Sequence, residues 1–227
     1  MSEREGSQRE RGATRAGRPA PAPGALSEER AQTRPGLTPD RVVAEAAALA
    51  DERGAAALSL AGVAERLGVR VPSLYKHVGG LDDLHRRIAL AGLRDLTEVL
   101  GAATVGRSGG DALRACAAAW RAYARAHPGR YAAVQRAPDR ADAELAAAGD
   151  RLTRLVFAVL RGYGLDDEET VHATRAVRSA LHGFVSLEAV GGFGLPQDVD
   201  ASFDRLVDLL HAGLGSGRAD VPVHHLS

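Results

Sequence analysis

Residues 59–78 have the sequence SLAGVAERLGVRVPSLYKHV, which contains two short helical patterns on either side of a glycine. Ser59 can cap the first helix, expected over residues 60–67, by accepting a hydrogen bond from its first turn. Gly68 ends this helix, because glycine tolerates the positive φ of a tight turn. The second helix is expected over residues 72–78, and its early proline suits a first turn.

The two short helices can pack against each other through small and apolar side chains. A helix-turn-helix needs a small residue where its helices touch and an apolar anchor on the second helix. Ala64 and Leu74 occupy these positions at the expected offsets. A further helix is expected over residues 41–53, and a long helix from about residue 82 to residue 100 follows the motif. Residues 37–82 are therefore predicted to form a three-helix head.

The rest of the chain also has helical character. Alanine, the residue with the highest helix propensity, is abundant, aromatic residues make up only 4%, and no alternating pattern predicts a strand. Five more helices are expected over residues 111–127, 130–136, 141–163, 167–190 and 200–214. The predicted fold class is all-α with about nine helices: residues 83–215 form a helical bundle, residues 1–36 a disordered tail and residues 216–227 a flexible tail.

Charge and cysteine content limit the function classes. The 29 basic and 29 acidic residues cancel, and residues 36–100 contain 8 basic and 9 acidic residues. Any contact with DNA is therefore expected to be local and to depend on dimerisation for affinity. The single cysteine, Cys116, cannot form an intramolecular disulfide, and no apolar run is long enough to span a membrane. A cytoplasmic protein without membrane association is expected.

The segment from Arg41 to Leu84 resembles the DNA-binding head of the tetracycline-repressor-like (TetR) family. The residues that carry the resemblance are Arg41-Val-Val-Ala-Glu-Ala-Ala47, Gly54, Val63-Ala64, Leu67-Gly68-Val69, Leu74-Tyr75, His77-Val78 and Leu84. The resemblance implies a homodimeric regulator, most commonly a repressor, that a small and largely apolar effector releases from double-stranded, pseudo-palindromic operator DNA. Many members have a phosphate-contacting lysine where this chain has Leu81, so that contact is not expected here.

The second helix of the motif can read bases. Arg70, Ser73 and Lys76 can reach base edges in the major groove, where each base pair presents a distinct pattern of donors and acceptors. Val71 and Pro72 are available for contact with thymine methyl groups.

Contacts to the DNA backbone are expected from residues around the same helix. The resemblance assigns Tyr75 and His77 to phosphates. Ser59 can add its hydroxyl or the free amides at the start of its helix. Lys76 is the only lysine of the chain.

The C-terminal half resembles a TetR subgroup that has Trp120, the run Ala126-His-Pro-Gly129, His182-Gly183 and Gly191-Gly192-Phe193. This implies a domain that senses a ligand and dimerises. Residues able to line a mostly apolar pocket with a few polar tips are Trp120, Tyr123, Phe157 and His172. Glu188 shares an apolar stripe, where a buried carboxylate needs a protein partner or a ligand, and both alternatives stay open.

Two apolar stripes mark the last two helices. Their members at helical spacing are Val177, Leu181, Phe184 and Val185, followed by Phe203, Leu206 and Leu210. Either stripe could be the core of one subunit. Because these are the last two helices of a TetR-like chain, we expect them to pair across a two-fold axis as a four-helix bundle.

Other chemistry has little support in the sequence. The histidines are scattered without the spacing of metal ligands, no glycine loop cradles a phosphate after a strand, and no nucleophile, base and acid can be grouped. No enzymatic activity, cofactor or metal is therefore expected. Two alternatives remain: a helical-bundle enzyme or carrier whose helix-turn-helix contacts proteins, and a DNA-binding protein without a ligand, which the lack of an internal cavity would favour.

Overall fold

A computed structural model describes residues 36–135 and 142–216 of the chain. Within these ranges all regular structure is helical and no strand is present, which confirms the predicted all-α class. The predicted tails lie outside the described residues, apart from one residue of each. Among the described helices, none is long and apolar enough to cross a membrane.

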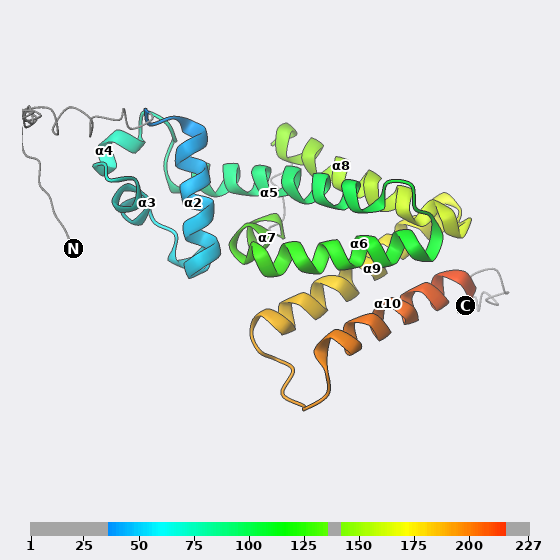
Figure 1. The fold of residues 1–227 in the computed structure, drawn as a ribbon. Coiled ribbons are helices and arrows are strands. Elements are labelled where there is room, and N and C mark those ends of the chain that lie inside the picture. The colour runs from blue at the N-terminus through cyan, green and yellow to red at the C-terminus, as the bar shows by residue number, and fades with distance from the viewer. Residues whose placement is uncertain (1–35, 136–141, 217–227) are drawn as a thin grey trace, which may run out of the picture. The chain divides into compact units, whose positions relative to one another are not determined.

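Three α-helices and one 3-10 turn form the N-terminal head: α2 (Pro39–Arg53), η1 (Ala55–Ala57), α3 (Leu60–Leu67) and α4 (Val71–Leu74). Helix α2 begins after Thr38, whose hydroxyl accepts a hydrogen bond from the backbone N–H of Arg41 at 3.2 Å. The head has an apolar core of its own, in which Leu74 and Leu84 are completely buried. Figure 1 shows these helices grouped at one end of the described chain.

Helix α5 (Leu81–Thr104) leads from the head into the body of the molecule (Figure 1). Its first turns, up to Ala89, contribute to the core of the head, and the residues from Leu90 onward contribute to the core of the body. The two hydrophobic cores therefore meet within α5, about two turns after the predicted boundary at residues 82 and 83.

The body contains five further α-helices and a 3-10 turn: α6 (Gly109–Ala126), α7 (Pro128–Val134), α8 (Ala143–Leu160), η2 (Arg161–Tyr163), α9 (Asp167–Ala189) and α10 (Val199–Ser216). Each corresponds to a predicted helix. Helix α8 ends three residues early because the chain tightens at Gly162, where a Cβ atom would lie 2.5 Å from the backbone nitrogen of Gly109. Helices α9 and α10 form a hairpin on one side of α6 (Figure 1).

Helix α7 of the body packs tightly against α2 of the head. A Cβ atom on Gly129 would lie 2.2 Å from the carbonyl carbon of Ala50, so only glycine allows this approach. The Asp51 carboxylate accepts a hydrogen bond from the backbone N–H of Arg130 at 2.8 Å and lies 3.3 Å from Nδ1 of His127. A displacement of α7 would therefore be transmitted directly to the head.

Candidate functional site

The predicted helix-turn-helix is present in α3 and α4. Gly68 has φ 67° and ψ 33°, the left-handed conformation that glycine favours, and its N–H donates to the carbonyl of Glu65 at 3.0 Å. Ala64 is 3% exposed at the contact between the helices, and Leu74 anchors α4 in the core. Helix α4 ends at Leu74, earlier than predicted, and residues 75–77 continue as turns.

The residues predicted to contact DNA all remain accessible on this motif. Ser59, Arg70, Pro72, Tyr75 and Lys76 are exposed, whereas Val71, Ser73 and His77 are half-buried. Tyr75 is 58% exposed, so both its ring and its hydroxyl are accessible to a binding partner. The Ser59 hydroxyl caps α3 by accepting from the N–H of Gly62 at 3.1 Å, which leaves its own proton to donate.

The cations of the head fall into two groups. Arg66 is held by Glu45 at 2.8 Å and by Glu52 at 2.6 Å. In contrast, Arg70 and Lys76 form no ion pair with any residue in the described ranges. Positive groups that are already in solvent and lack an internal carboxylate are free to neutralise phosphates or to bind guanine.

A cavity of about 700 Å³ lies in the body between α5, α7, α8 and α9, and α6 contributes its tryptophan. Two of the predicted pocket residues, Trp120 and Phe157, line it. Its volume is in the range of small-molecule pockets. The presence of this cavity disfavours the alternative of a DNA-binding protein without a ligand.

Three predicted pocket residues do not line this cavity. Tyr123 lies three residues after Trp120 and faces α5, where its hydroxyl donates to the carbonyl of Gly92 at 3.3 Å. His172 is exposed, because it lies 100° around α9 from the cavity-lining Val171. The prediction that Tyr123 and His172 contact a ligand in this cavity is therefore wrong. The third residue is Glu188.

Glu188 is held by a protein partner instead of facing the cavity. Its carboxylate accepts hydrogen bonds from Arg121 at 2.5 and 2.9 Å, and these bonds keep the pKa of Glu188 below its usual value. Asp200 accepts another bond from Arg121 at 2.7 Å, and the guanidinium lies over the rings of Phe184 and Phe203. Of the two alternatives for Glu188, the structure supports the internal ion pair.

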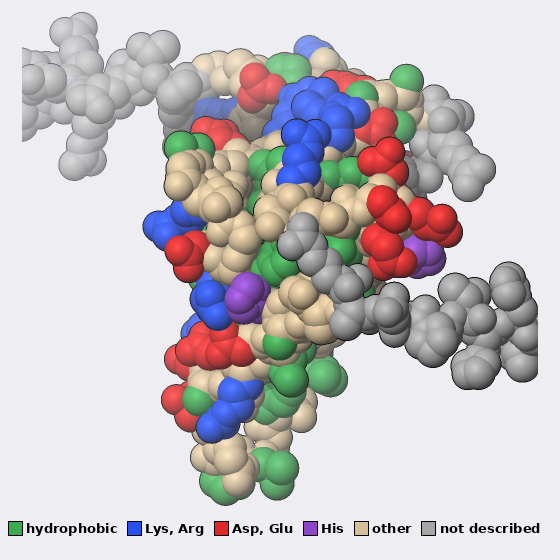
Figure 2. Space-filling model, turned by 90° about the vertical axis from the view of Figure 1, so that its right-hand side faces the viewer, with side chains coloured by type: hydrophobic (Ala, Val, Ile, Leu, Met, Phe, Trp, Pro, Cys, Tyr) green, Lys and Arg blue, Asp and Glu red, His purple; other side chains and the backbone are tan. Residues whose placement is uncertain are grey.

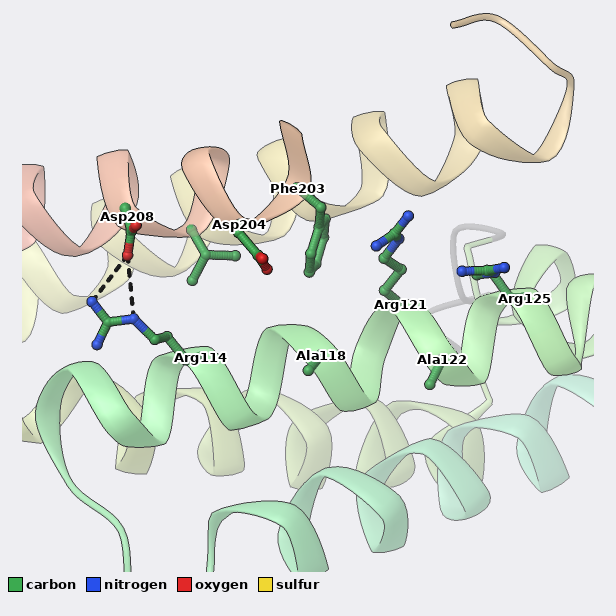
Figure 3. Close-up of a pocket in the computed structure, with 9 residues that line it drawn as sticks. Arg114, Ala118, Arg121, Ala122, Arg125, Phe203, Asp204 and Asp208 are labelled. Atoms are coloured by element: carbon green, nitrogen blue, oxygen red, sulfur yellow. Dashed lines mark hydrogen bonds and ion pairs between the residues drawn. The ribbon is translucent and has the colours of Figure 1, made fainter. Parts of the chain in front are cut away.

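This ion-pair cluster joins α6 to the last two helices. Figure 3 shows Arg114, Arg121 and Arg125 on α6 facing Phe203, Asp204 and Asp208 on α10, across a groove of about 550 Å³. Arg114 donates to Asp208 at 3.0 Å at one end of the groove, and Arg121 is paired at the other. The charges of Arg114, Arg121 and Asp208 are thus engaged within the protein.

A chain of hydrogen bonds that the sequence did not predict leads from the cavity to α9. The indole N–H of Trp120 donates to the Tyr131 hydroxyl at 3.0 Å, and this hydroxyl lies 3.0 Å from Nδ1 of His182. Burial lowers the pKa of His182 and so favours its neutral ring, whose Nδ1 can accept the Tyr131 proton when the ring's own proton is on Nε2. Because these residues are far apart in the sequence, their contacts could not be predicted from it. The only signal for His182 was its place in the His182-Gly183 pair of the TetR subgroup.

Comparison with known proteins identifies the family. Residues 42–87 match the model "Bacterial regulatory proteins, tetR family", and residues 113–210 match "Tetracyclin repressor-like, C-terminal domain". An HTH-type transcriptional regulator of Mycobacterium tuberculosis is 39% identical over 179 residues, which cover 78% of this chain and 82% of the relative. The chain belongs to the TetR family. A second HTH-type regulator, from Bacillus subtilis, is 34% identical and is aligned over 79% of this chain and 93% of its own.

Solved structures support the same fold. A Rhodococcus protein of unknown function has a TM-score of 0.69 at 22% identity, covering 82% of this chain and 99% of its own. A TetR regulator of Streptomyces coelicolor has a TM-score of 0.63 at 19% identity, covering 80% and 99%. A TetR variant of Acinetobacter baumannii in complex with minocycline has a TM-score of 0.59 at 22% identity, covering 82% and 100%.

As a TetR-family protein, the chain is a ligand-responsive, DNA-binding transcriptional regulator and not an enzyme. This sets aside the alternative of a helical-bundle enzyme or carrier.

The stripes predicted for the dimer interface of this TetR regulator are largely buried within one subunit. Val177, Leu181, Val185 and Phe203 are at most 4% exposed in the core of the body. Phe184 and Leu210 pack against the same core, and Leu206 is half-buried. The four buried residues cannot reach another chain, so their assignment is corrected. A helical stripe shows that a face is covered, but not whether its own chain or a second copy covers it.

The exposed faces of α9 and α10 have a different composition. Small and apolar residues at helical spacing on the solvent side are Ala176, Ser179, the half-buried Gly183 and Leu187 on α9, Val190 directly after α9, and Leu209 and Gly213 on α10. Leu187 is 50% and Leu209 71% exposed. Figure 2 shows hydrophobic side chains gathered toward the end of the molecule where the α9–α10 hairpin lies.

Proposed function

We propose that two copies of this chain bind a pseudo-palindromic operator, repress transcription from it and are released when a small molecule enters the body cavity. The observation that carries the DNA-binding part is the exposed segment 70–76 around α4, in which Arg70 and Lys76 have no ion-pair partner among the described residues while Leu74 holds the backbone in place. Such a regulator would act in the cytoplasm, where the single buried thiol of Cys116 suits reducing conditions.

In the proposed complex, each α4 enters a major groove. The two half-sites would lie about 34 Å apart, one helical turn of DNA, or further apart by whole turns. Arg70, Ser73 and Lys76 would reach base edges, with Val71 and Pro72 beside thymine methyl groups. Tyr75, His77 and Ser59 would contact phosphates, which position the protein without reading the sequence.

The proposed dimer interface uses the exposed faces of the α9–α10 hairpin. Small residues such as Ala176 and Gly183 would allow close approach, while Leu187 and Leu209 would be removed from water. A Cβ atom on Gly183 meets nothing within 4 Å in the single subunit, so packing within that subunit does not require glycine there. Paired across a two-fold axis, two hairpins form a four-helix bundle.

The coupling of effector to DNA is supported by residues that the cavity and the head share. Ala89 and Ala133 line the cavity and also belong to the core of the head. An effector that pushes on α5 and α7 would therefore move the head directly, through α5 itself and through the contact of Gly129 with α2. A coupling free energy of about 1–3 kcal/mol is enough to weaken DNA binding 5- to 150-fold.

The test is fluorescence anisotropy with labelled DNA from the region upstream of the chain's own gene. We expect the wild-type protein to bind this DNA with an affinity that falls as salt rises. The double variant Tyr75→Ala, Lys76→Ala should lose at least about tenfold in affinity, because each subunit of the dimer loses two contacts.

Arg154→Ala is the matched control, since Arg154 is exposed on α8 and has no ion-pair partner among the described residues. It should bind DNA as the wild type does. Unchanged affinity of the double variant would show that α4 does not contact the operator.

A further inference from the structure

We propose that the effector is an amphiphilic anion, with an apolar body in the cavity and a carboxylate or similar anionic head at its α9 side. This inference rests on the proposed function, in which the body cavity is the effector site. It adds the chemical class of the ligand, which the family does not specify.

The inner walls of the cavity are apolar. Side chains from four helices cover them, namely Leu93, Trp120, Val134, Leu152, Val156 and Phe157. Trp120 and Val156 are themselves buried, so the cavity extends into the core of the body. A long hydrocarbon segment would be desolvated here without leaving any polar group of its own unpaired.

One polar atom beside the cavity has no partner. Thr174 lines the cavity, and its hydroxyl oxygen is enclosed by protein and forms no hydrogen bond with any described residue. A buried hydroxyl without a partner is unfavourable, and nearly all such groups in proteins are satisfied. A rotation of the Thr174 side chain toward the cavity would let an oxygen of a ligand head group accept its proton.

Two arginines follow Thr174 on the same side of α9 and also line the cavity. Arg175 has no ion-pair partner among the described residues, and Arg178 donates only to the side-chain amide oxygen of Gln135, at 3.3 Å. The charge of Arg178 acts toward the interior, where it contributes to lowering the pKa of His182. These guanidiniums differ from that of Arg121, which already has two carboxylate partners.

The charge balance at the cavity favours an anion over a cation. Among the described residues that line it, Asp150 is the only acidic one, against the two guanidiniums of Arg175 and Arg178. Guanidinium groups bind carboxylates through charge-assisted hydrogen bonds, which are stronger than those to neutral acceptors. A head group with a negative charge would thus meet one hydroxyl donor and two cations on consecutive turns of α9.

The experiment uses the tryptophan that the cavity provides. Trp120 is the only tryptophan in the chain, so its fluorescence reports on the cavity alone. The full-length protein is titrated with three probes of equal chain length: dodecanoate, 1-dodecanol and dodecyltrimethylammonium. We expect dodecanoate to bind at least about tenfold more tightly than the alcohol, and the cation to bind most weakly.

Variants of α9 then locate the head group. Arg178→Gln should remove most of the advantage of dodecanoate and leave the affinity for 1-dodecanol unchanged, whereas Arg154→Gln on α8 should change neither. Thr174→Val should weaken dodecanoate binding. It should also raise the melting temperature of the ligand-free protein, because it removes a buried hydroxyl that has no partner.

The outcomes separate this inference from the proposed function. Equal binding of acid and alcohol, or tighter binding of the cation, would overturn the anionic class and leave the cavity as the effector site. If none of the three probes changes the fluorescence of Trp120, the anionic class is overturned as well. Either result is independent of the anisotropy assay, where loss of DNA binding in the α4 variants tests the proposed function by itself.

Discussion

Two cations of the head, Arg70 and Lys76, and one of the body, Arg121, use their positive charge in opposite ways. On the head, Arg70 lies exposed just before α4 and Lys76 just after it, and neither has an ion-pair partner among the described residues. In the body, Arg121 is 8% exposed, pairs with Glu188 and Asp200, and lies over two aromatic rings. The first arrangement is available to an external anion, whereas the second holds helices together.

The difference shows that pairing and burial, more than the presence of a cation, separate binding sites from structural ones. A buried guanidinium must find carboxylates within the protein because desolvation of an unpaired charge is costly. An exposed cation has no such requirement and keeps its full capacity for a partner that arrives from outside. The substitutions below test this contrast.

The largest effect is expected from Arg121→Ala. Removing one partner of a largely buried ion pair leaves Glu188, whose side chain is 17% exposed, without its main counter-charge. We expect a loss of about 3–5 kcal/mol in the free energy of unfolding, measured by urea denaturation. Arg70→Ala is the matched control and should change this free energy by less than about 0.5 kcal/mol.

A double variant sharpens this first prediction. Arg121→Met combined with Glu188→Leu removes both charges and keeps much of the apolar contact with Phe184 and Phe203. It should be more stable than Arg121→Ala alone, since no buried charge is left unpaired. Equal loss in both variants would indicate that packing, and not the ion pair, is what Arg121 supplies.

The next effect is expected from Leu74→Ala, which removes the anchor of α4. Leu74 is completely buried, and truncation of such a leucine costs about 2–5 kcal/mol through lost burial and a residual cavity. The free energy of unfolding should fall by this amount and DNA affinity should fall with it. Val99→Ala, at a residue that is 39% exposed, is the control and should have little effect on either.

Smaller effects are expected from two substitutions at Gly183, one that should stabilise the helix and one that should weaken the dimer. Gly183→Ala should stabilise α9 by about 1 kcal/mol, because alanine has the higher helix propensity and open space surrounds the position in one subunit. Gly183→Leu should weaken the dimer about tenfold or more in sedimentation equilibrium, since overpacking of a close contact is unfavourable. Ala102→Leu, at an exposed position of α5, should leave the dimer unchanged.

The smallest effect is expected from protonation of His182. Burial lowers the pKa of this ring below 6.5. At pH values between the folded pKa and 6.5, the unfolded chain therefore binds more protons than the folded chain. Stability should therefore fall as pH falls through this window, when Nδ1 can no longer accept the Tyr131 proton. Melting temperatures at pH 7.5 and 5.5 test this. His182→Asn, which keeps an acceptor without a titrating ring, should show a smaller difference between the two.

The local signals of the sequence were sufficient to predict the helices and the DNA-binding motif. Ser59 and Gly68 act through hydrogen bonds to residues three to four positions away, so their roles follow from short-range stereochemistry, and the role of Leu74 follows from its apolar type and its place in the motif. Trp120 and Phe157 were also correctly expected at a common cavity, since both are large and apolar. For Tyr123 and His172 the residue type was suitable, but the direction of the side chain around its helix was not known.

What the sequence by itself determined is thus the order, the approximate positions and the buried stripes of the helices, together with the family. The tertiary structure alone decided which surface covers each stripe, and it turned Val177, Leu181, Val185 and Phe203 inward within one subunit. It also brought Arg121 to Glu188, 67 residues away, and left the Thr174 hydroxyl without a partner. The physical reason is that periodicity records which side of a helix is removed from water, whereas the identity of the neighbour depends on how distant helices pack.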